Sequence, residues 1–517
     1  MQLEHISSKI LCMGNMSNNI YSIQNTIFAD DNAVLMLVAL LEAGETNFFM
    51  ALYNEKAIFN ATINRLDNGR YQLNFSIPES LSESIDIDDF FKKPVILMIP
   101  SPNANVPNLN IIVSQNDVES VKLSINEGFR KVAVTLKAFR ADFDDQIWNQ
   151  SKQTAIFRFN PSKFDPSHKG IIYDITTNKD QTYKFKNAVK IELKSKLYLF
   201  YYEEISKDLG FFIIKSPDLV CHDDLEEAVD AIRSAYALLT GYYIAESVFY
   251  FSMKPKDKKS LTFRYQSLNR SINSPKPILD YHRYQNIDDE KLLMTSDVFE
   301  NLVKILYKNV ELRRACVLIT QAGTLDNISK GSLASVSLET ITSAFNNATS
   351  EKHRVAKLIE DKAVITQLKY ELQKATKKVK DKLDKEIWNK LWNKISKFNE
   401  LPNASKLSSP FVNLGINLSE EEEYCITCRN LYLHGNVPKP KGNKYKYLTQ
   451  DELQLLIADR LCMLSAMLLL KKAGYNGYVV DWGATEIVYK REIAAGHGNK
   501  HLTFQLRDMA EQDNDKE

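Results

Sequence analysis

Three side chains that could do chemistry together stand in the stretch SEEEEYCITCRNLYLHG, residues 419–435. Arg429 has a guanidinium that can hold a phosphate through two hydrogen bonds and stabilise negative charge developing on it. Asn430 has an amide that can orient a neighbouring group, and His434 has an imidazole that exchanges a proton near neutral pH. Together they suffice for metal-free cleavage of RNA, in which a 2′-hydroxyl attacks the adjacent phosphate. DNA lacks that hydroxyl and would be a poor substrate.

The same stretch carries the signals of a single helix that would position these groups. Ser419 and Glu422 match a capping box, and the four consecutive glutamates lie where the helix dipole favours anions. Gly435 can end the helix in the left-handed conformation. At about 100° per residue, Arg429 lies roughly 140° around the helix from His434, so its long side chain has to reach across.

Two cysteines on this helix, Cys425 and Cys428, form a C-x-x-C pair, which can be half a zinc site or a redox pair. The sequence contains no second C-x-x-C, and His434 lies too far around the helix to join both sulfurs easily. Cysteines three residues apart on a helix are often small packed residues. We therefore interpret the pair as packing residues, and we expect no metal and no cofactor.

The composition is that of an ordinary soluble globular protein. The 517 residues include 66 Lys and Arg against 65 Asp and Glu, so net charge alone says nothing about an anionic partner. Six cysteines in so long a chain make no disulfide framework and fit a reducing cytoplasm. The longest apolar runs, 33–41 and 461–470, are shorter than the roughly 20 residues that cross a bilayer. We expect a cytoplasmic protein without a membrane partner.

The expected fold class is α+β, in three parts. Residues 1–286 form a β-rich region, antiparallel and sandwich-like, as one unit or two subdomains; residues 287–475 form an all-helical bundle; residues 476–517 form an extension with a polar tail. The hairpin signal is Leu66-Asp67-Asn68-Gly69, because Asn-Gly supplies positive φ angles. Short strands rich in β-branched and aromatic residues are predicted throughout, with a last strand near Tyr250 ahead of a linker. Examples are 47–53, 61–65, 71–77, 94–99, 131–136, 155–159 and 197–202.

One amphipathic helix, 223–242, interrupts the β-rich region and is closed by Gly241. Cys221 and His222, just before it, could be imagined as a nucleophile and its base. Adjacent residues rarely face each other, however, and we interpret them as the start of the helix. The β-rich region contains no recognisable catalytic string.

The C-terminal half is predicted to be helical almost throughout. A helix at 295–320 is followed by a segment with Gly323 and Gly331, then by one or two long helices in 332–401, which contains neither Gly nor Pro. After a break at 402–410 and the motif helix, a capped helix runs from Thr449 to Gly474 with its leucines in the core, and 486–489 is a possible strand.

Lysines crowd the long helical span: residues 351–400 contain 14 Lys and Arg against 8 Asp and Glu. Such a face could bind RNA phosphates. The simpler interpretation, which we prefer, is the solvated face of an amphipathic helix whose apolar stripe includes Ile365, Leu368 and Leu372.

The motif in its helical setting resembles the catalytic motif of HEPN ribonucleases: Arg429, a polar residue, three more positions, His434 and Gly435. More narrowly, a β-rich region ahead of such a domain is similar to the ApeA-like HEPN proteins of bacterial anti-phage defence. Asn430 stands where the family favours a small polar residue. Glu339, in the segment 337–340, matches an earlier helix where an acidic residue often faces the site. The resemblance covers about 288–474; for the N-terminal half it concerns architecture only.

The resemblance implies a four- or five-helix bundle that forms a homodimer, with Arg429 and His434 of both copies facing one another across a shared cleft. It implies a metal-independent endoribonuclease of abortive infection that cuts tRNA, rRNA or mRNA, leaves a cyclic phosphate, and is inactive until the N-terminal region senses a phage-derived trigger. For Glu339 an ordinary exposed helix residue is an equally good interpretation. A function of another class is a catalytically silent dimerisation or RNA-binding module that uses the basic helix.

Overall fold

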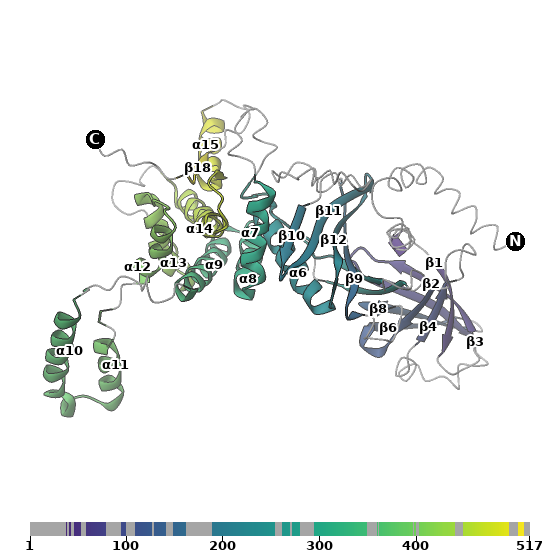
Figure 1. The fold of residues 1–517 in the computed structure, drawn as a ribbon, viewed down its shortest axis with the longest axis horizontal. Helices are drawn as coiled ribbons and strands as arrows, with labels where there is room; N and C mark the ends of the chain where they lie inside the picture. Colours follow the sequence, from purple (N-terminus) through teal and green to yellow (C-terminus); the bar gives the residue numbers. More distant parts are fainter. Residues whose placement is uncertain are drawn as a thin grey trace. The chain divides into compact units, whose positions relative to one another are not determined.

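The computed structural model divides the chain into two compact units (Figure 1). We call Met1–Asn273, Asp280–Asp288 and Leu293–Lys308 the β-rich unit, and Ser274–Leu279, Asp289–Leu292 and Asn309–Glu517 the helical unit. The structure describes residues 38, 41–42, 46–52, 58–78, 95–99, 109–126, 129–140, 148–161, 189–253, 261–268, 271–279, 294–348, 359, 361–396, 398–399, 403–439, 448–495 and 505–510.

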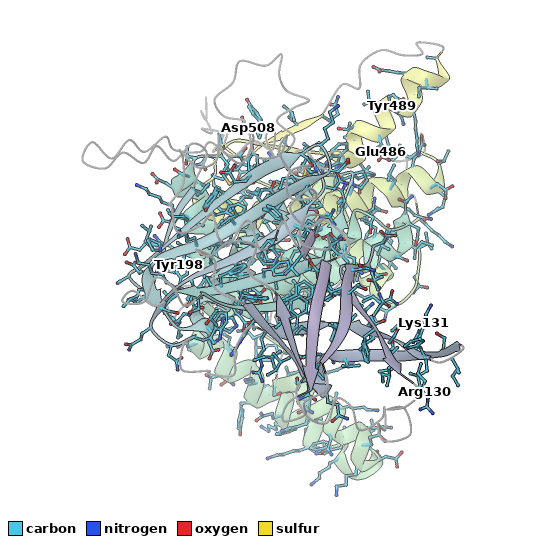
Figure 2. The ribbon with its side chains drawn as sticks, turned by 90° about the vertical axis from the view of Figure 1, so that its right-hand side faces the viewer. Arg130, Lys131, Tyr198, Glu486, Tyr489 and Asp508 are labelled. Atoms are coloured by element: carbon cyan, nitrogen blue, oxygen red, sulfur yellow. The ribbon has the colours of Figure 1, made fainter. Side chains whose placement is uncertain are left out.

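The β-rich unit is built on an antiparallel sheet with strand order β10-β11-β12-β9-β14-β15-β8-β5-β4-β1-β2-β3-β7-β6. Tyr198 lies on the second strand from one end of this order, and Arg130 and Lys131 lie on the second strand from the other (Figure 2). The strands are β1 Thr46–Leu52, β2 Ile58–Arg65, β3 Tyr71–Pro78, β4 Val95–Ile99, β5 Leu109–Val113, β6 Val118–Asn126, β7 Phe129–Leu136, β8 Ala138–Arg140, β9 Ser151–Phe159, β10 Val189–Leu193, β11 Lys196–Ser206, β12 Leu209–Val220, β14 Ser247–Met253 and β15 Leu261–Ser267.

Strands far apart in that order share one hydrophobic core. Val134 of β7 and Tyr201 of β11 belong to one buried cluster that runs across the intervening strands. The antiparallel, β-rich prediction is confirmed, as is the hairpin, in which Arg65 pairs with Tyr71. One detail of the turn was wrong: only Gly69 has a positive φ, 74°, while the Asn68 side chain accepts a hydrogen bond from the Arg70 amide.

The helix of the β-rich region, α6 His222–Thr240, ends at Gly241 in the left-handed conformation, as predicted. Cys221 is its N-cap and accepts from the Asp224 amide, which confirms the helix-start interpretation. A second helix, α7 Ser296–Tyr307, packs on α6 and β10 within this unit. The last segment of the β-rich unit therefore ends at Lys308, while the short segments 274–279 and 289–292 belong to the helical unit, so the units interleave around the expected boundary at 286/287.

The helical unit is organised around α14, whose buried leucines confirm the predicted core helix. It contacts α8, α9, α13 and α15. By length and composition α14 could cross a membrane: its most apolar stretch has a mean hydropathy of 1.8. However, 94% of that stretch is buried inside the unit. The elements are α8 Val310–Ala322, α9 Asn327–Ala348, α10 Lys362–Lys377, α11 Lys385–Ser396, α12 Asn403–Asn413, α13 Glu420–Leu433, α14 Gln450–Ala473, α15 Trp482–Ala494, β17 Tyr478–Val480 and β18 Leu506–Asp508.

Several predicted helix boundaries were wrong. The expected single helix at 295–320 is two helices, because the Asn309 side chain caps α8 by accepting from the amides of Glu311 and Leu312. Gly331 lies inside α9 and not in a connecting segment. The break at 402–410 is largely helix α12, which contains Pro410. The possible strand at 486–489 is part of helix α15.

The predicted long helix with a lysine-rich face turns back on itself. Helices α10 and α11 form a hairpin, joined by the short 3-10 turn Lys380–Lys382. The apolar stripe beginning at Ile365 is therefore not one continuous seam. Of the predicted polar tail, residues 511–517 lie outside the described part of the chain.

Candidate active site

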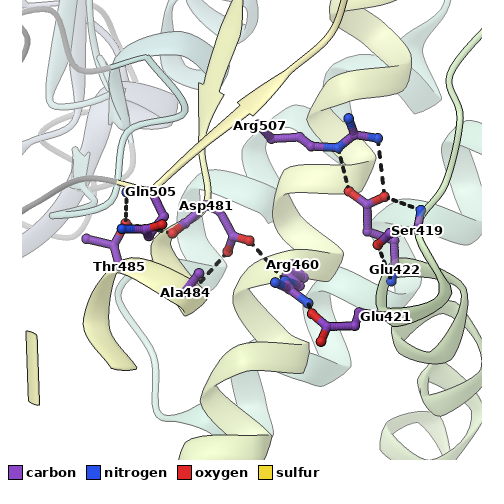
Figure 3. Close-up of polar contacts among 9 residues, drawn as sticks. All are labelled: Ser419, Glu421, Glu422, Arg460, Asp481, Ala484, Thr485, Gln505 and Arg507. Atoms are coloured by element: carbon purple, nitrogen blue, oxygen red, sulfur yellow. Dashed lines mark hydrogen bonds and ion pairs between the residues drawn. The ribbon is translucent and has the colours of Figure 1, made fainter. Parts of the chain in front are cut away.

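The motif helix α13 begins with the predicted capping box. The Ser419 hydroxyl accepts from the Glu422 amide at 3.2 Å, and the Glu422 carboxylate accepts from the Ser419 amide at 2.7 Å. That carboxylate is buried and also binds Arg507, with Nε 2.8 Å and Nη2 3.3 Å from its two oxygens (Figure 3). A cation from the C-terminal segment thus compensates the charge that the cap buries.

The neighbouring carboxylate is also engaged. Glu421 accepts from Nη1 of Arg460 at 2.6 Å, while Arg460 Nε donates to Asp481, the N-cap of α15, at 2.9 Å (Figure 3). Burial opposes the charge of Arg460, but the two carboxylates outweigh it and raise the pKa of its guanidinium. The acidic run is therefore a helix start, as the sequence predicted. The ion pairs that hold it to α14 and β18 were not predicted.

The other end of α13 has the predicted left-handed glycine. Gly435 has φ +69°, the Gly435 amide donates to the Tyr432 carbonyl at 3.1 Å, and the Asn436 amide donates to the Leu431 carbonyl at 2.8 Å. These two bonds are those of a Schellman motif. His434 is the C-cap residue, so its imidazole stands at the last turn.

Arg429 points into the helical unit. Its side chain is 5% exposed, and Nη1 lies 3.5 Å from a carboxylate oxygen of Glu339 on α9. Its buried Nε has no hydrogen-bond acceptor among the residues that the structure describes. A guanidinium with an unmet buried donor and a single long contact retains capacity to bind an anion.

The other two candidates point outward. Asn430 and His434 are both exposed, as expected for residues four apart on one helix face. The fold therefore brings Arg429 and Glu339 together, but it holds Arg429 and His434 on different sides of α13. The reason is the 140° separation that the sequence predicts, combined with burial of the arginine face against α9.

The packing that fixes this rotation of α13 involves Tyr432. Its hydroxyl donates to the Gln454 carbonyl at 3.0 Å, and burial raises its pKa. A Cβ built on Gly331 would lie 2.4 Å from the tyrosine ring, so only glycine fits there. The Ser332 hydroxyl donates to the Tyr432 carbonyl at 3.3 Å, which joins α9 to the end of the motif helix.

Glu339 also borders an open groove of about 710 Å³ between α8 and α9. The sequence analysis did not identify this groove, although its α9 residues recur at the three- and four-residue spacing of one helix face. The groove contains a second carboxylate, Glu311, so it is acidic apart from the neighbouring Arg429. Its lining is Asn309, Glu311, Val336, Glu339, Thr340, Ser343 and Ala344.

The C-x-x-C pair lies in the core. Cys425 and Cys428 are 1% and 3% exposed, and burial raises the pKa of the Cys425 thiol, so it stays protonated. Their interpretation as packing residues is confirmed. Within the described residues, no group of three or more His, Cys, Asp or Glu is arranged to hold a metal ion.

Two supporting arginines were missed by the sequence analysis. Arg460 had a weak signal, since it stands beside Asp459 within an otherwise apolar helix. Arg507 had none, because its partner Glu422 is 85 residues away.

Comparisons of this protein with protein-family models, with curated proteins and with solved structures find no match.

Proposed function

We propose that this protein is a metal-independent endoribonuclease of HEPN type, with Arg429 and His434 acting in a cleft between two copies of the chain. The observation that carries the proposal is the state of Arg429. Its guanidinium is nearly fully buried, yet Nε lacks an acceptor among the described residues and the only ion pair, to Glu339, is long. Such a group is suited to a phosphate, which accepts several hydrogen bonds at once. To reach a phosphate beside His434, the Arg429 side chain would have to turn from Glu339 toward the surface of α13 that carries the imidazole.

In the proposed reaction the 2′-hydroxyl of one nucleotide attacks its own 3′-phosphate. A neutral His434 accepts the hydroxyl proton, the P–O2′ bond forms, and the P–O5′ bond breaks. The departing 5′-oxygen takes a proton from the imidazolium of His434 of the second copy. The products are a 2′,3′-cyclic phosphate and a 5′-hydroxyl, and Arg429 stabilises the charge on the phosphorane.

The surface beside His434 supports a second copy. Leu431 and Leu433, three residues and one residue before it in the sequence, are each 36% exposed. Exposed apolar side chains favour burial against another surface. A two-fold interface here would supply two imidazoles to one cleft, which the reaction requires as base and acid.

The biological setting follows from the resemblance of the motif and the architecture. We infer that the enzyme acts in anti-phage defence by abortive infection in the cytoplasm, cutting tRNA, rRNA or mRNA. The β-rich unit would then be the sensor of a phage-derived trigger. Glu339, which contacts Arg429, would be a positioning residue for the guanidinium.

The test is cleavage of total RNA by the full chain, alone and in extract from phage-infected bacteria, with and without EDTA. We expect Arg429→Ala and His434→Ala to lose at least about 100-fold in rate, and EDTA to have no effect. Glu423→Gln, an exposed change on the same helix, is the matched control and should cleave like the parent.

Other results would overturn the proposal. If the parent cleaves no RNA under these conditions, or if both alanine variants cleave as well as the parent, the catalytically silent dimerisation or RNA-binding module is the better description. Cleavage lost on adding EDTA would indicate a metal-dependent activity instead.

A further inference from the structure

The hairpin of α10 and α11 is exposed over almost its whole length. Within Lys362–Lys377 only Thr376 is buried, and within Lys385–Ser396 only Ile395 is. Asn399 closes the base by exchanging two hydrogen bonds with the backbone of Ile359, at 2.9 and 3.1 Å. The hairpin therefore presents two helices and a tip on a defined base, and most of its side chains are available to a partner.

The charge of this hairpin is strongly positive. Between residues 361 and 396 there are ten lysines and five acidic residues. Five of the lysines crowd the tip, and all five are exposed; among the described residues none of them lies within ion-pair distance of a carboxylate. Unneutralised charge concentrated at a tip indicates an anionic partner. The five are Lys377, Lys378, Lys380, Lys382 and Lys385.

Aromatic rings accompany the lysines. Trp388 and Trp392 stack with centroids 5.4 Å apart and an interplanar angle of 28°, and Lys380 Nζ lies 5.7 Å from the Trp388 ring centroid. Tyr370, 58% exposed, has Lys374 Nζ at 5.9 Å from its ring. Ring faces next to ammonium groups match a chain that carries a phosphate and a flat base in every repeat unit.

The lysines of α10 also follow a line. Lys362, Lys369 and Lys377 fall within about 80° of one another around the helix, with successive separations of about 10 to 12 Å along its axis. Leu368 lies about 100° or more around the helix from each of these lysines, whereas Leu372 lies about 60° from Lys369, so the apolar stripe borders the lysine face on one side. A strand laid along the lysine face would meet an ammonium group at about every second phosphate.

We propose that the tip and the lysine face of the α10–α11 hairpin bind single-stranded RNA and deliver it to the helical unit that cuts it. This inference rests on the proposed ribonuclease function for the fate of the RNA, but not for its binding. Lysines hold the phosphates, which gives affinity without sequence preference, and the exposed Tyr370 ring stacks on a base. The groove with Glu311 and Glu339, in contrast, is too acidic to bind a phosphate chain along its length.

The experiment measures binding separately from cleavage. A fluorescein-labelled oligouridylate is titrated at several salt concentrations with the full-length His434→Ala protein, which we expect to cut it at least about 100-fold more slowly than the parent. Replacing the five tip lysines by glutamine should weaken binding by at least about tenfold. It should also flatten the slope of log K against log[salt] by about 0.7 for each phosphate contact removed. The control with arginine at all five positions keeps the charge and should keep affinity and slope.

The rings have their own test. Tyr370→Ala should weaken binding on the order of tenfold, whereas Tyr370→Phe keeps the ring and should bind like the parent. Circular dichroism of each variant checks that helix content is unchanged. Leu368→Ser, on the apolar face, should leave RNA affinity unaltered.

An unchanged dissociation constant and salt slope in the glutamine variant would overturn the inference. So would an RNA affinity that depends on Leu368 and not on the lysines, which would make the hairpin a protein-docking element. If the parent cleaves RNA and the variant with five glutamines at the tip binds and cleaves it equally well, the inference fails and the proposed function stands. If the lysines bind RNA but the parent never cuts it, the binding surface stands and the proposed function fails.

Discussion

Arg507 in β18 lies against Glu422 in the first turn of α13, with Nε 2.8 Å and Nη2 3.3 Å from the two carboxylate oxygens. The same carboxylate accepts from the Ser419 amide, so one buried group joins the helix cap to a strand 85 residues further along the chain. Strand β18 pairs with β17, which directly follows α14. The C-terminal extension is therefore part of the support of the motif helix.

Removal of this arginine should destabilise the helical unit. We expect Arg507→Ala to lower the free energy of unfolding by about 2 kcal/mol, because Glu422 is buried and would lose a charged hydrogen-bond partner. Arg507→Lys, which keeps the charge but loses the two-pronged geometry, should cost less. Urea denaturation measures both, and an unchanged midpoint for Arg507→Ala would contradict the expectation.

The contact between Gly331 and Tyr432 makes a second prediction. Alanine is ordinarily the better helix residue by about 1 kcal/mol, but here its Cβ would lie 2.4 Å from the tyrosine ring. We expect Gly331→Ala to destabilise the unit by about 1 to 3 kcal/mol and to reduce RNA cleavage, because α13 must shift. Gly435→Ala has open space around it and should cost only its left-handed backbone conformation, about 1 kcal/mol. Thermal and urea unfolding would compare the two.

Glu339 should matter for catalysis and little for stability. Its side chain is 50% exposed and its contact with Arg429 is long, so Glu339→Gln should change the free energy of unfolding by less than about 1 kcal/mol. If Glu339 orients the guanidinium, the same change should lower kcat about tenfold with little effect on KM. Steady-state cleavage of a short RNA tests this. Equal kcat values for parent and variant would make Glu339 an ordinary exposed helix residue.

A fourth prediction concerns pH and the β-rich unit. Burial raises the pKa of Glu203 on β11 from 4.5 to about 7. The native state therefore holds the Glu203 proton to a higher pH than the unfolded chain does. The contribution of this group to the free energy of unfolding is fully present below about pH 4.5 and is lost as pH rises through about 7. Between these limits we expect the parent to lose about 2 kcal/mol relative to Glu203→Gln, which cannot ionise. Urea denaturation of both proteins at pH 4.5 and pH 8 measures the difference.

The shared cleft predicts dominance in mixtures. If parent and His434→Ala chains are mixed in equal amounts and exchange subunits freely, only about a quarter of the dimers carry two imidazoles. Parent activity should then fall to about half, whereas a site within one chain would leave it unchanged. A His434→Ala protein that also carries Leu433→Asp, at the exposed apolar surface, should fail to inhibit. Undiminished parent activity in the first mixture would contradict the shared cleft.

Signals confined to a few neighbouring residues could be interpreted from the sequence. The capping boxes at Ser419 and Thr449 and the left-handed ends at Gly241, Gly435 and Gly474 are where the sequence predicted them. A cap depends on residues within about four positions of each other, so the printed order contains the whole interaction. The strands succeeded for a similar reason, because alternation of buried residues is local.

Tertiary structure decided the rest. Gly331 indicated a break in the sequence but lies inside a helix, because the Tyr432 ring, a hundred positions away, occupies the space of a side chain. The lysine-rich span contains no Gly or Pro and still folds back as a hairpin. The sequence by itself determined that Arg429 and His434 stand about 140° apart on one helix. Only packing decided that the arginine face turns inward to Glu339 while the imidazole stays outside, because burial of a helix face depends on segments that the helix meets in space.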